Sequence, residues 1–209
     1  MWPAVRTLMF GGLGGKLLGI GRELLTAALF GTGAIAVAYR LAQAAFLIPL
    51  NGLLSDSFTA GFTPAYARDR LERTQGPLLF CATHAAVLTV SLVVGLALAL
   101  CADAWVRLLA PGFDADTARM AARMIGVLSI AMPCYALTGL YAAAELAAGQ
   151  ARMAAARASM QSLGLMLGAL AAWRFAEPVF LAIGFLAAYA ILAAWGFARM
   201  RAQGLRPWP

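Results

Sequence analysis

Five ionisable residues lie inside the strongly apolar first third of the chain, between residues 10 and 64. They are Lys16, Arg22, Glu23, Arg40 and Asp56. An ionisable group at bilayer depth costs a few kcal/mol or more, so such groups usually face a water-accessible space lined by protein. This pattern therefore favours a transport function over a purely structural membrane segment.

Lys16 and Arg22 are the two residues in this stretch that are best suited to binding phosphate. Six residues apart, they lie within two turns of a helix. Arginine offers a planar fork of donors to a phosphate, and lysine offers a mobile point charge. The alternative is that Arg22 pairs with Glu23 or caps a helix near the membrane interface, and the residues alone leave both interpretations open.

The composition predicts an integral membrane protein. The chain is 63% hydrophobic and 12% charged, with a mean hydropathy of +0.80, whereas soluble domains are roughly 45–50% apolar and about 25% charged. The net charge of +7 comes from arginines scattered between apolar runs. Since nucleic-acid binding needs a contiguous basic face, we expect these arginines to meet anionic lipid headgroups and expect no nucleic-acid partner.

The sequence does not predict an enzyme, a metal site or a cofactor. Cys81, Cys101 and Cys134 lie in apolar stretches without metal-ligand spacing. His84 is the single histidine, and one histidine without an acidic partner makes a poor metal or catalytic site, so a packing role is expected. No nucleophile motif or cluster of catalytic residue types is present in the chain.

The apolar runs predict one all-α bundle over residues 1–209, with about six transmembrane helices. A spanning helix needs about 20 mainly apolar residues, and four such windows are clear. Two further helices, interrupted by glycine, proline and charge, are needed upstream. The expected helices cover residues 8–30, 34–65, 77–102, 117–145, 153–174 and 178–199.

Arginine placement predicts the orientation of this bundle. Basic residues mark alternate connections, and the positive-inside rule assigns such connections to the cytoplasm. With six helices both termini then lie in the cytoplasm. The connections are marked by Arg68, Arg70 and Arg73, by Arg152 and Arg157, and by Arg199, Arg201 and Arg206.

Glycines in the first helix predict close helix packing. Gly11, Gly15 and Gly19 form small-xxx-small patterns, which let helices approach one another in a membrane. Contact with a ligand is the alternative interpretation. Positions assigned to helix packing or hinge motion are Gly15, Gly19, Gly31, Gly33 and Pro64.

Three ordered motifs resemble the opening of the MurJ/MviN-type lipid II flippases, in the superfamily of multidrug, oligosaccharidyl-lipid and polysaccharide exporters. They are GKLLGIGRE over 15–23, ALFGTG over 28–33 and SFTAGFTPAYAR over 57–68. The segment LAPGF over 109–113 resembles a later connection of that family. Residues that match family positions are Lys16, Arg22, Glu23, Phe30, Gly31, Gly33, Phe58, Phe62 and Pro64.

The resemblance implies two helical lobes around a central cationic cavity in the bacterial cytoplasmic (inner) membrane. Lys16 and Arg22 would hold the diphosphate of a polyprenyl-linked sugar that moves from the cytoplasmic to the outer leaflet. Glu23 matches a family position and belongs to the implied substrate-binding set. Arg40 matches no family position; with Asp56 it stands in place of charges that the family has, and we expect it to assist in binding the substrate. A charged diphosphate must be neutralised away from water to cross a bilayer, which agrees with this role.

Two departures from the family shape the expected function. Val37 stands where the family commonly has an acidic residue, and LIPLNG over 47–52 replaces an arginine-rich stretch. These changes leave room for a related polyprenyl-linked glycan, or for lost or altered activity. The chain also holds six of the family's roughly fourteen helices. We therefore expect the N-terminal lobe alone, either as a fragment or with a homodimer or second-lobe partner.

Two alternative functions stay open. The first is a drug or small-cation exporter of the same superfamily, which needs buried carboxylates; Glu23, Asp56 and Glu145 are the candidates. The second is a non-transporting membrane module that assembles a partner through small-residue faces. This module would tolerate loss of charge at Lys16 and Arg22 and would fail when Gly15 or Gly19 becomes leucine.

Overall fold

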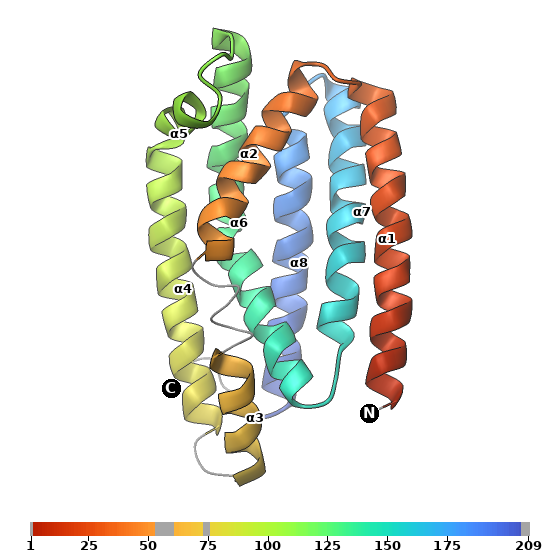
Figure 1. Ribbon diagram of the computed structural model, residues 1–209, viewed down its shortest axis with the longest axis vertical. Coiled ribbons are helices and arrows are strands. Elements are labelled where there is room, and N and C mark those ends of the chain that lie inside the picture. The colour runs from red at the N-terminus through yellow and green to blue at the C-terminus, as the bar shows by residue number, and fades with distance from the viewer. Residues whose placement is uncertain (1, 53–60, 73–75, 206–209) are drawn as a thin grey trace.

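The computed structural model describes residues 2–52, 61–72 and 76–205, and every regular element in these ranges is a helix (Figure 1). The prediction of an all-α fold is confirmed for this part of the chain. The helices are α1 (Trp2–Phe30), α2 (Ala34–Leu50), α3 (Thr63–Glu72), α4 (Gly76–Leu100), α5 (Ala102–Leu109), α6 (Ala115–Ala147), α7 (Arg152–Phe175) and α8 (Phe180–Ala202).

Three of the described helices, α4, α6 and α8, are long and apolar enough to cross a membrane. Helix α2 is apolar but has 17 residues, a length of about 25 Å at 1.5 Å per residue. Helices α1 and α7 have 29 and 24 residues, so they are long enough to reach across a bilayer core of about 30 Å, but they are not among the three candidate spans. The expected count of about six spans stays a prediction.

The long helices stand side by side in one bundle (Figure 1). Helix α1 lies at one edge, beside α7, and α4 lies at the other edge. Helices α1, α4 and α7 run in one direction, and α6 and α8 run in the other. Helix α2 starts at the end where α1 finishes, crosses in front of α6 and α8, and stops about halfway along the bundle.

The structure describes only parts of the helix expected over 34–65, so this helix as a whole stays a prediction. Helix α2 ends at Leu50, just after Pro49, which lacks a backbone donor. Helix α3 begins at Thr63, directly after a π-helical turn at residues 61–62, and Pro64 lies in its first turn. Residues 53–60, which include Asp56 and Phe58, lie outside the described residues.

Aromatic rings from three helices fill the core where α2 crosses the bundle. Phe46 of α2 packs edge-on against Tyr135 of α6 and Phe185 of α8, with ring centroids 5.5 and 5.3 Å apart. Phe46 and Phe185 are fully buried. Edge-to-face pairs of this kind add to the free energy gained by burying apolar surface, so these rings hold α2 against α6 and α8.

Glycines bring α7 and α8 into backbone contact. A Cβ atom added to Gly164 would lie 2.5 Å from the carbonyl oxygen of Gly184, and one added to Gly168 would lie 2.6 Å from that of Phe180. Such spacing is possible only without side chains, as in small-xxx-small crossings of membrane helices. Gly164 and Gly168 have the same small-xxx-small spacing as Gly11 and Gly15 of α1, so this spacing is the sequence signal for the crossing.

His84 of α4 is buried and takes part in core packing. Its Nε2 atom lies 3.0 Å from the hydroxyl of Tyr141 on α6, and its ring stacks on the Tyr141 ring with centroids 5.9 Å apart. In the described ranges, no three histidine, cysteine or acidic side chains gather as metal ligands.

Candidate functional site

The sequence of α1 places its polar residues on two neighbouring faces of the helix. Residues seven apart share a face, because seven steps of about 100° nearly complete two turns. Gly15 and Arg22 therefore share one face, and Gly15 packs against Ala158 of α7. Lys16 and Glu23 share the adjacent face, which is the face that reaches toward α2.

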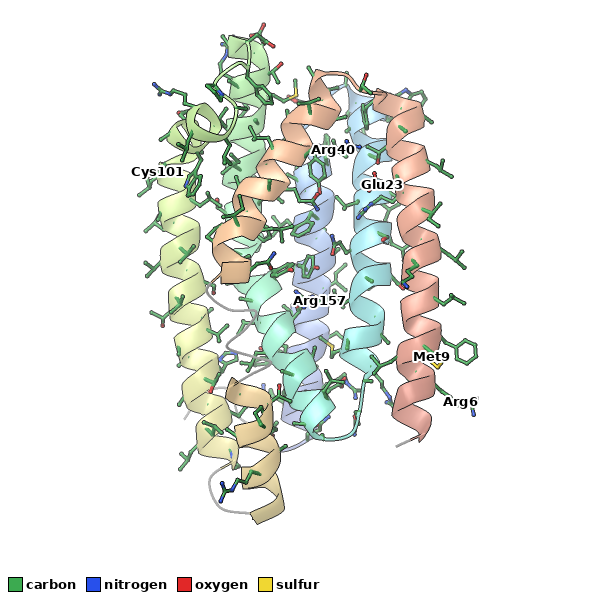
Figure 2. All side chains as sticks on the ribbon, viewed as in Figure 1. Arg6, Met9, Glu23, Arg40, Cys101 and Arg157 are labelled. Atoms are coloured by element: carbon green, nitrogen blue, oxygen red, sulfur yellow. The ribbon has the colours of Figure 1, made fainter. Side chains whose placement is uncertain are left out.

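Arg22, Glu23 and Arg40 form a charge cluster, which we call the Arg22 cluster. The Arg22 guanidinium donates to Glu23 Oε1 at 2.5 Å, and the Arg40 guanidinium lies 4.0 Å from Glu23 Oε2. The Arg22 side chain is 24% exposed and the Arg40 side chain 76% exposed. Two guanidinium groups thus share one carboxylate, and the cluster keeps a net positive charge. Figure 2 labels two of its members, Glu23 on α1 and Arg40 on α2.

A small cavity of about 90 Å³ adjoins this cluster, between α1, α2, α7 and α8. Tyr39 lines it and is buried, and the Tyr39 hydroxyl has no hydrogen-bond partner. Buried hydroxyl groups are nearly always hydrogen-bonded, so an unpartnered one indicates a place for water or a ligand. The lining residues are Arg22, Glu23, Thr26, Ala36, Tyr39, Arg40, Gln43, Leu165 and Leu181.

Lys16 lies deeper than the Arg22 cluster and outside the small cavity. It is exposed and makes no ion pair with a described residue. Position 16 is the midpoint of α1, about 21 Å from either end of the helix. Since Lys16 shares its helix face with Glu23, it lies on the same side of α1. It is about 10 Å from Glu23 along the helix axis, toward the middle of the helix.

Arg157 is a cation inside the bundle that the sequence analysis assigned to a connection. The structure places it in α7, with its guanidinium carbon 4.4 Å from the ring centroid of Tyr135 and 5.8 Å from that of Tyr189. The Tyr189 hydroxyl donates to Gln161 Oε1 at 2.8 Å. Arg157 and Gln161 are four residues apart, so their shared helix face was the signal that could have identified this polar site.

Glu145 is fully buried and ties together the ends of three helices. Its Oε2 atom accepts a hydrogen bond from the backbone N–H of Met153 at 2.8 Å, and its Oε1 atom accepts one from Arg199 Nε. Arg199 also donates to Gln150 Oε1 at 2.9 Å. We call these groups the Glu145 clamp. Because both oxygens are occupied, this carboxylate is not free to bind a transported cation.

The glycines assigned to packing or hinges have different surroundings. Gly15 touches Ala158, whereas nothing lies within 4 Å of a Cβ added to Gly19. Gly31 has a φ of 55° in the turn between α1 and α2, a conformation that favours glycine. Gly33 precedes the first residue of α2 as its N-cap. The structure thus brings Arg22, Glu23 and Arg40 together and leaves Lys16 apart.

Comparison with known proteins gives one line of support. The chain is 30% identical over 168 residues to a curated protein of the cyanobacterium Synechocystis sp. named "Probable lipid II flippase MurJ". The match covers 78% of this chain and 31% of that protein, so the chain spans about a third of the length of its relative. No family model matches the chain, and no solved structure matches it. The match supports the resemblance to the MurJ-type flippases.

Proposed function

We propose that the chain is one lobe of a transporter that moves a polyprenyl-diphosphate sugar from the cytoplasmic to the outer leaflet of the bacterial cytoplasmic membrane. Lys16, Arg22 and Arg40 supply the positive charge for the diphosphate. Glu23 holds the two arginines in place when the substrate is absent. The similarity to a protein named as a lipid II flippase supports the substrate class.

The observation that carries this proposal is the shared carboxylate of the Arg22 cluster. One carboxylate cannot neutralise two guanidinium groups, so the cluster attracts a further anion. A diphosphate presents several oxygens to arginine donors, and hydrogen bonds between charged partners are roughly twice as strong as neutral ones. The unpartnered Tyr39 hydroxyl beside Arg22 adds a donor for the same anion.

The distribution of arginine supports the proposed orientation. The end of the bundle where α1 and α7 begin and α8 finishes, which we call the basic end, also holds α3 (Figure 1). Under the positive-inside rule we propose that this end faces the cytoplasm. Its arginines are Arg6, Arg68, Arg70, Arg152, Arg199 and Arg201; those of the opposite end are Arg107, Arg119, Arg123 and Arg174.

The proposal includes a second lobe. Alternating access needs two helical bundles that move against each other around a common site, and this chain covers 31% of its relative. Helix α2 stops about halfway along the bundle (Figure 1), and Lys16, on the side of α1 that also carries Glu23, is exposed. We propose that a second copy or a separate lobe covers this side and completes the cavity.

Binding of a lipid diphosphate tests the role of the cluster. The purified chain in detergent is titrated with polyprenyl diphosphate, and binding is measured by native mass spectrometry. We expect Arg22→Ala and Arg40→Ala each to weaken binding about tenfold, the value of one charge-assisted hydrogen bond. Arg119→Ala is the matched control, because Arg119 also pairs with an exposed acid, Asp116, but at the opposite end. Equal binding by all variants contradicts the proposal.

The cation-exporter alternative receives less support from the structure. It requires free carboxylates within the membrane. Of the three candidates, Glu145 is occupied by Arg199 and Met153, and Glu23 is occupied by Arg22. Asp56 lies outside the described residues.

The non-transporting module is tested best at Gly19. Gly15→Leu would push α1 away from Ala158 within this chain, so it would disturb either kind of protein. Gly19 has open space around it, so Gly19→Leu leaves the bundle intact and blocks only close approach of a partner helix. Function that survives Gly19→Leu and fails in Lys16→Ala/Arg22→Ala supports the transporter, and the reverse supports the module.

A further inference from the structure

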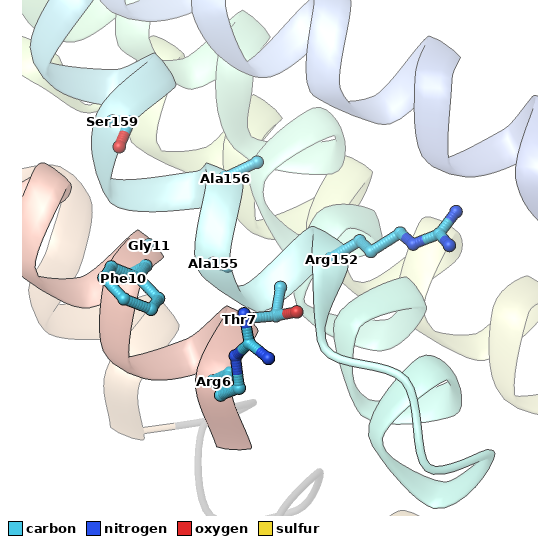
Figure 3. Close-up of a pocket in the computed structure, with 8 residues that line it drawn as sticks. All are labelled: Arg6, Thr7, Phe10, Gly11, Arg152, Ala155, Ala156 and Ser159. Carbon is cyan, nitrogen blue, oxygen red and sulfur yellow. The ribbon is translucent and has the colours of Figure 1, made fainter. Parts of the chain in front are cut away.

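A groove of about 760 Å³ lies between the first turns of α1 and α7, at the basic end of the bundle. We call it the α1–α7 groove (Figure 3). None of its described lining residues is acidic, and two of them are arginines, one from each helix. The lining residues are Arg6, Thr7, Phe10, Gly11, Arg152, Ala155, Ala156 and Ser159.

The two helices place their groove residues in the same order. On α1, Arg6 comes one turn before Phe10, and on α7, Arg152 comes one turn before Ala156. Since both helices run away from the basic end, the arginines lie at the outer end of the groove and the apolar walls lie one turn deeper. The groove therefore has arginines at its mouth and an apolar interior. In Figure 3 the Arg152 side chain extends away from Arg6, so the two guanidinium groups flank the mouth.

Close helix contact closes the groove at its deeper end. A Cβ added to Gly11 would collide with Ala155, and one added to Gly15 would lie 2.7 Å from Ala158. The Arg22 cluster lies beyond this contact on the same helix. A molecule in the groove is thus separated from the proposed substrate site by packed backbone.

We propose that the α1–α7 groove binds the phosphate headgroup of an anionic membrane phospholipid, with the upper part of an acyl chain against Phe10 and Ala156. The inference rests on the membrane orientation in the proposed function, which puts the groove mouth at the cytoplasmic headgroup layer. Charge complementarity identifies the occupant: Arg6 and Arg152 form no ion pair with a described residue. Each basic side chain near the cytoplasmic headgroup layer adds to the attraction for anionic lipid.

Lipid retention by the purified full chain tests this site. The chain in neutral detergent is titrated with phosphatidylglycerol or phosphatidylcholine, and bound lipid is counted by native mass spectrometry. We expect preferential binding of phosphatidylglycerol, about tenfold weaker in Arg6→Ala and in Arg152→Ala, as for loss of one charge-assisted hydrogen bond. Arg201→Ala is the matched control, because it removes the same charge from an exposed position at the same end, outside the groove.

Each outcome decides between named explanations. If Arg201→Ala weakens phosphatidylglycerol binding as much as Arg6→Ala and Arg152→Ala do, the lipid is attracted by the general positive charge of the protein, and the proposed site is overturned. Equal binding of phosphatidylglycerol and phosphatidylcholine would also overturn it. A further outcome is that polyprenyl diphosphate displaces phosphatidylglycerol from the chain and that Arg152→Ala weakens the binding of polyprenyl diphosphate. That result would identify the groove as a substrate site and overturn the assignment of a phospholipid as its occupant. Arg22→Ala should leave phosphatidylglycerol binding unchanged. Lipid binding that depends on Arg152 therefore stands even if Arg22→Ala shows no effect on the lipid diphosphate.

Discussion

At the scale of single residues, the charged side chains divide into those that satisfy one another and those that do not. The Glu145 clamp is satisfied: each carboxylate oxygen has a donor, and Arg199 has a second acceptor in Gln150. The Arg22 cluster has two guanidinium groups for one carboxylate. A satisfied buried cluster holds helices in place, whereas an incompletely neutralised one can recruit an anion.

Removing the Glu145 carboxylate should destabilise the bundle. Glu145→Ala leaves the Met153 N–H without its partner and Arg199 without its carboxylate, while Arg199 keeps some access to solvent. We expect a loss of about 2–3 kcal/mol in the free energy of unfolding, seen as a lower thermal midpoint in detergent. Glu177→Ala is the control, because Glu177 is exposed. Equal midpoints for both variants would contradict the clamp.

Asp114 should make stability depend on pH at the start of α6. Its carboxylate accepts hydrogen bonds from the Thr117 N–H at 2.9 Å and the Thr117 hydroxyl at 2.7 Å, which lower its pKa below the ordinary value. Because the pKa of this carboxyl is lower in the folded state than the unfolded value of about 4, the ionised carboxylate stabilises the fold above about pH 4. This contribution is lost as the pH falls through the folded-state pKa. At pH 7 the thermal midpoint of Asp114→Ala should be lower than that of the unmodified chain. At pH 3 the two midpoints should approach each other. A constant gap would show that the charge has no role.

At the scale of elements, small residues decide which helices touch. Helix α7 contacts α1 through Ala155 and Ala158 and contacts α8 through Gly164 and Gly168. It is therefore the element that joins α1, with Lys16 and Arg22, to the rest of the bundle. Without a strong hydrophobic drive between helices in lipid, such close backbone contact is a main source of association.

A methyl group at the α7–α8 crossing should force these helices apart. In Gly184→Ala the new Cβ would overlap the Gly164 carbonyl oxygen and lie 2.8 Å from the Gly168 Cα atom. We expect a loss of about 1–3 kcal/mol, typical of overpacking. Gly126→Ala is the control, because nothing lies within 4 Å of a Cβ added there. A lower thermal midpoint for Gly126→Ala than for Gly184→Ala would contradict close packing of α7 and α8 at this crossing.

At the scale of the whole molecule, the sequence predicts the class of fold better than the contacts between its helices. Apolar composition and run lengths predict an all-α membrane bundle. The described residues form only helices, and three of these helices are long and apolar enough to cross a membrane. Periodicity within α1 predicts which residues share a face. It cannot show that Glu145 meets Arg199, 54 residues away, or that Arg157 lies over rings from two other helices. Those pairings depend on how the helices cross one another. The spacing of residues within a single helix carries no information on these crossings.

Labelling from outside the cell tests the orientation of the bundle. In a chain whose three cysteines are replaced by alanine, Gln203→Cys lies at the basic end and Asp116→Cys at the opposite end, and both positions are exposed. We expect a membrane-impermeant maleimide to label position 116 in intact cells and position 203 only after lysis, because of the positive-inside rule. The opposite pattern would reverse the proposed orientation.

The central claim is that cations on α1 carry a lipid diphosphate across the membrane. Its most direct test is the leaflet accessibility of a polyprenyl-diphosphate glycan in proteoliposomes that hold the chain alone or with a candidate second lobe. The comparison is Lys16→Ala/Arg22→Ala against Arg107→Ala/Arg174→Ala, which removes two exposed arginines at the opposite end. We predict translocation that falls at least about tenfold in the first variant and persists in the second. Translocation that is undiminished in the first variant, or absent in every arrangement, would contradict the claim.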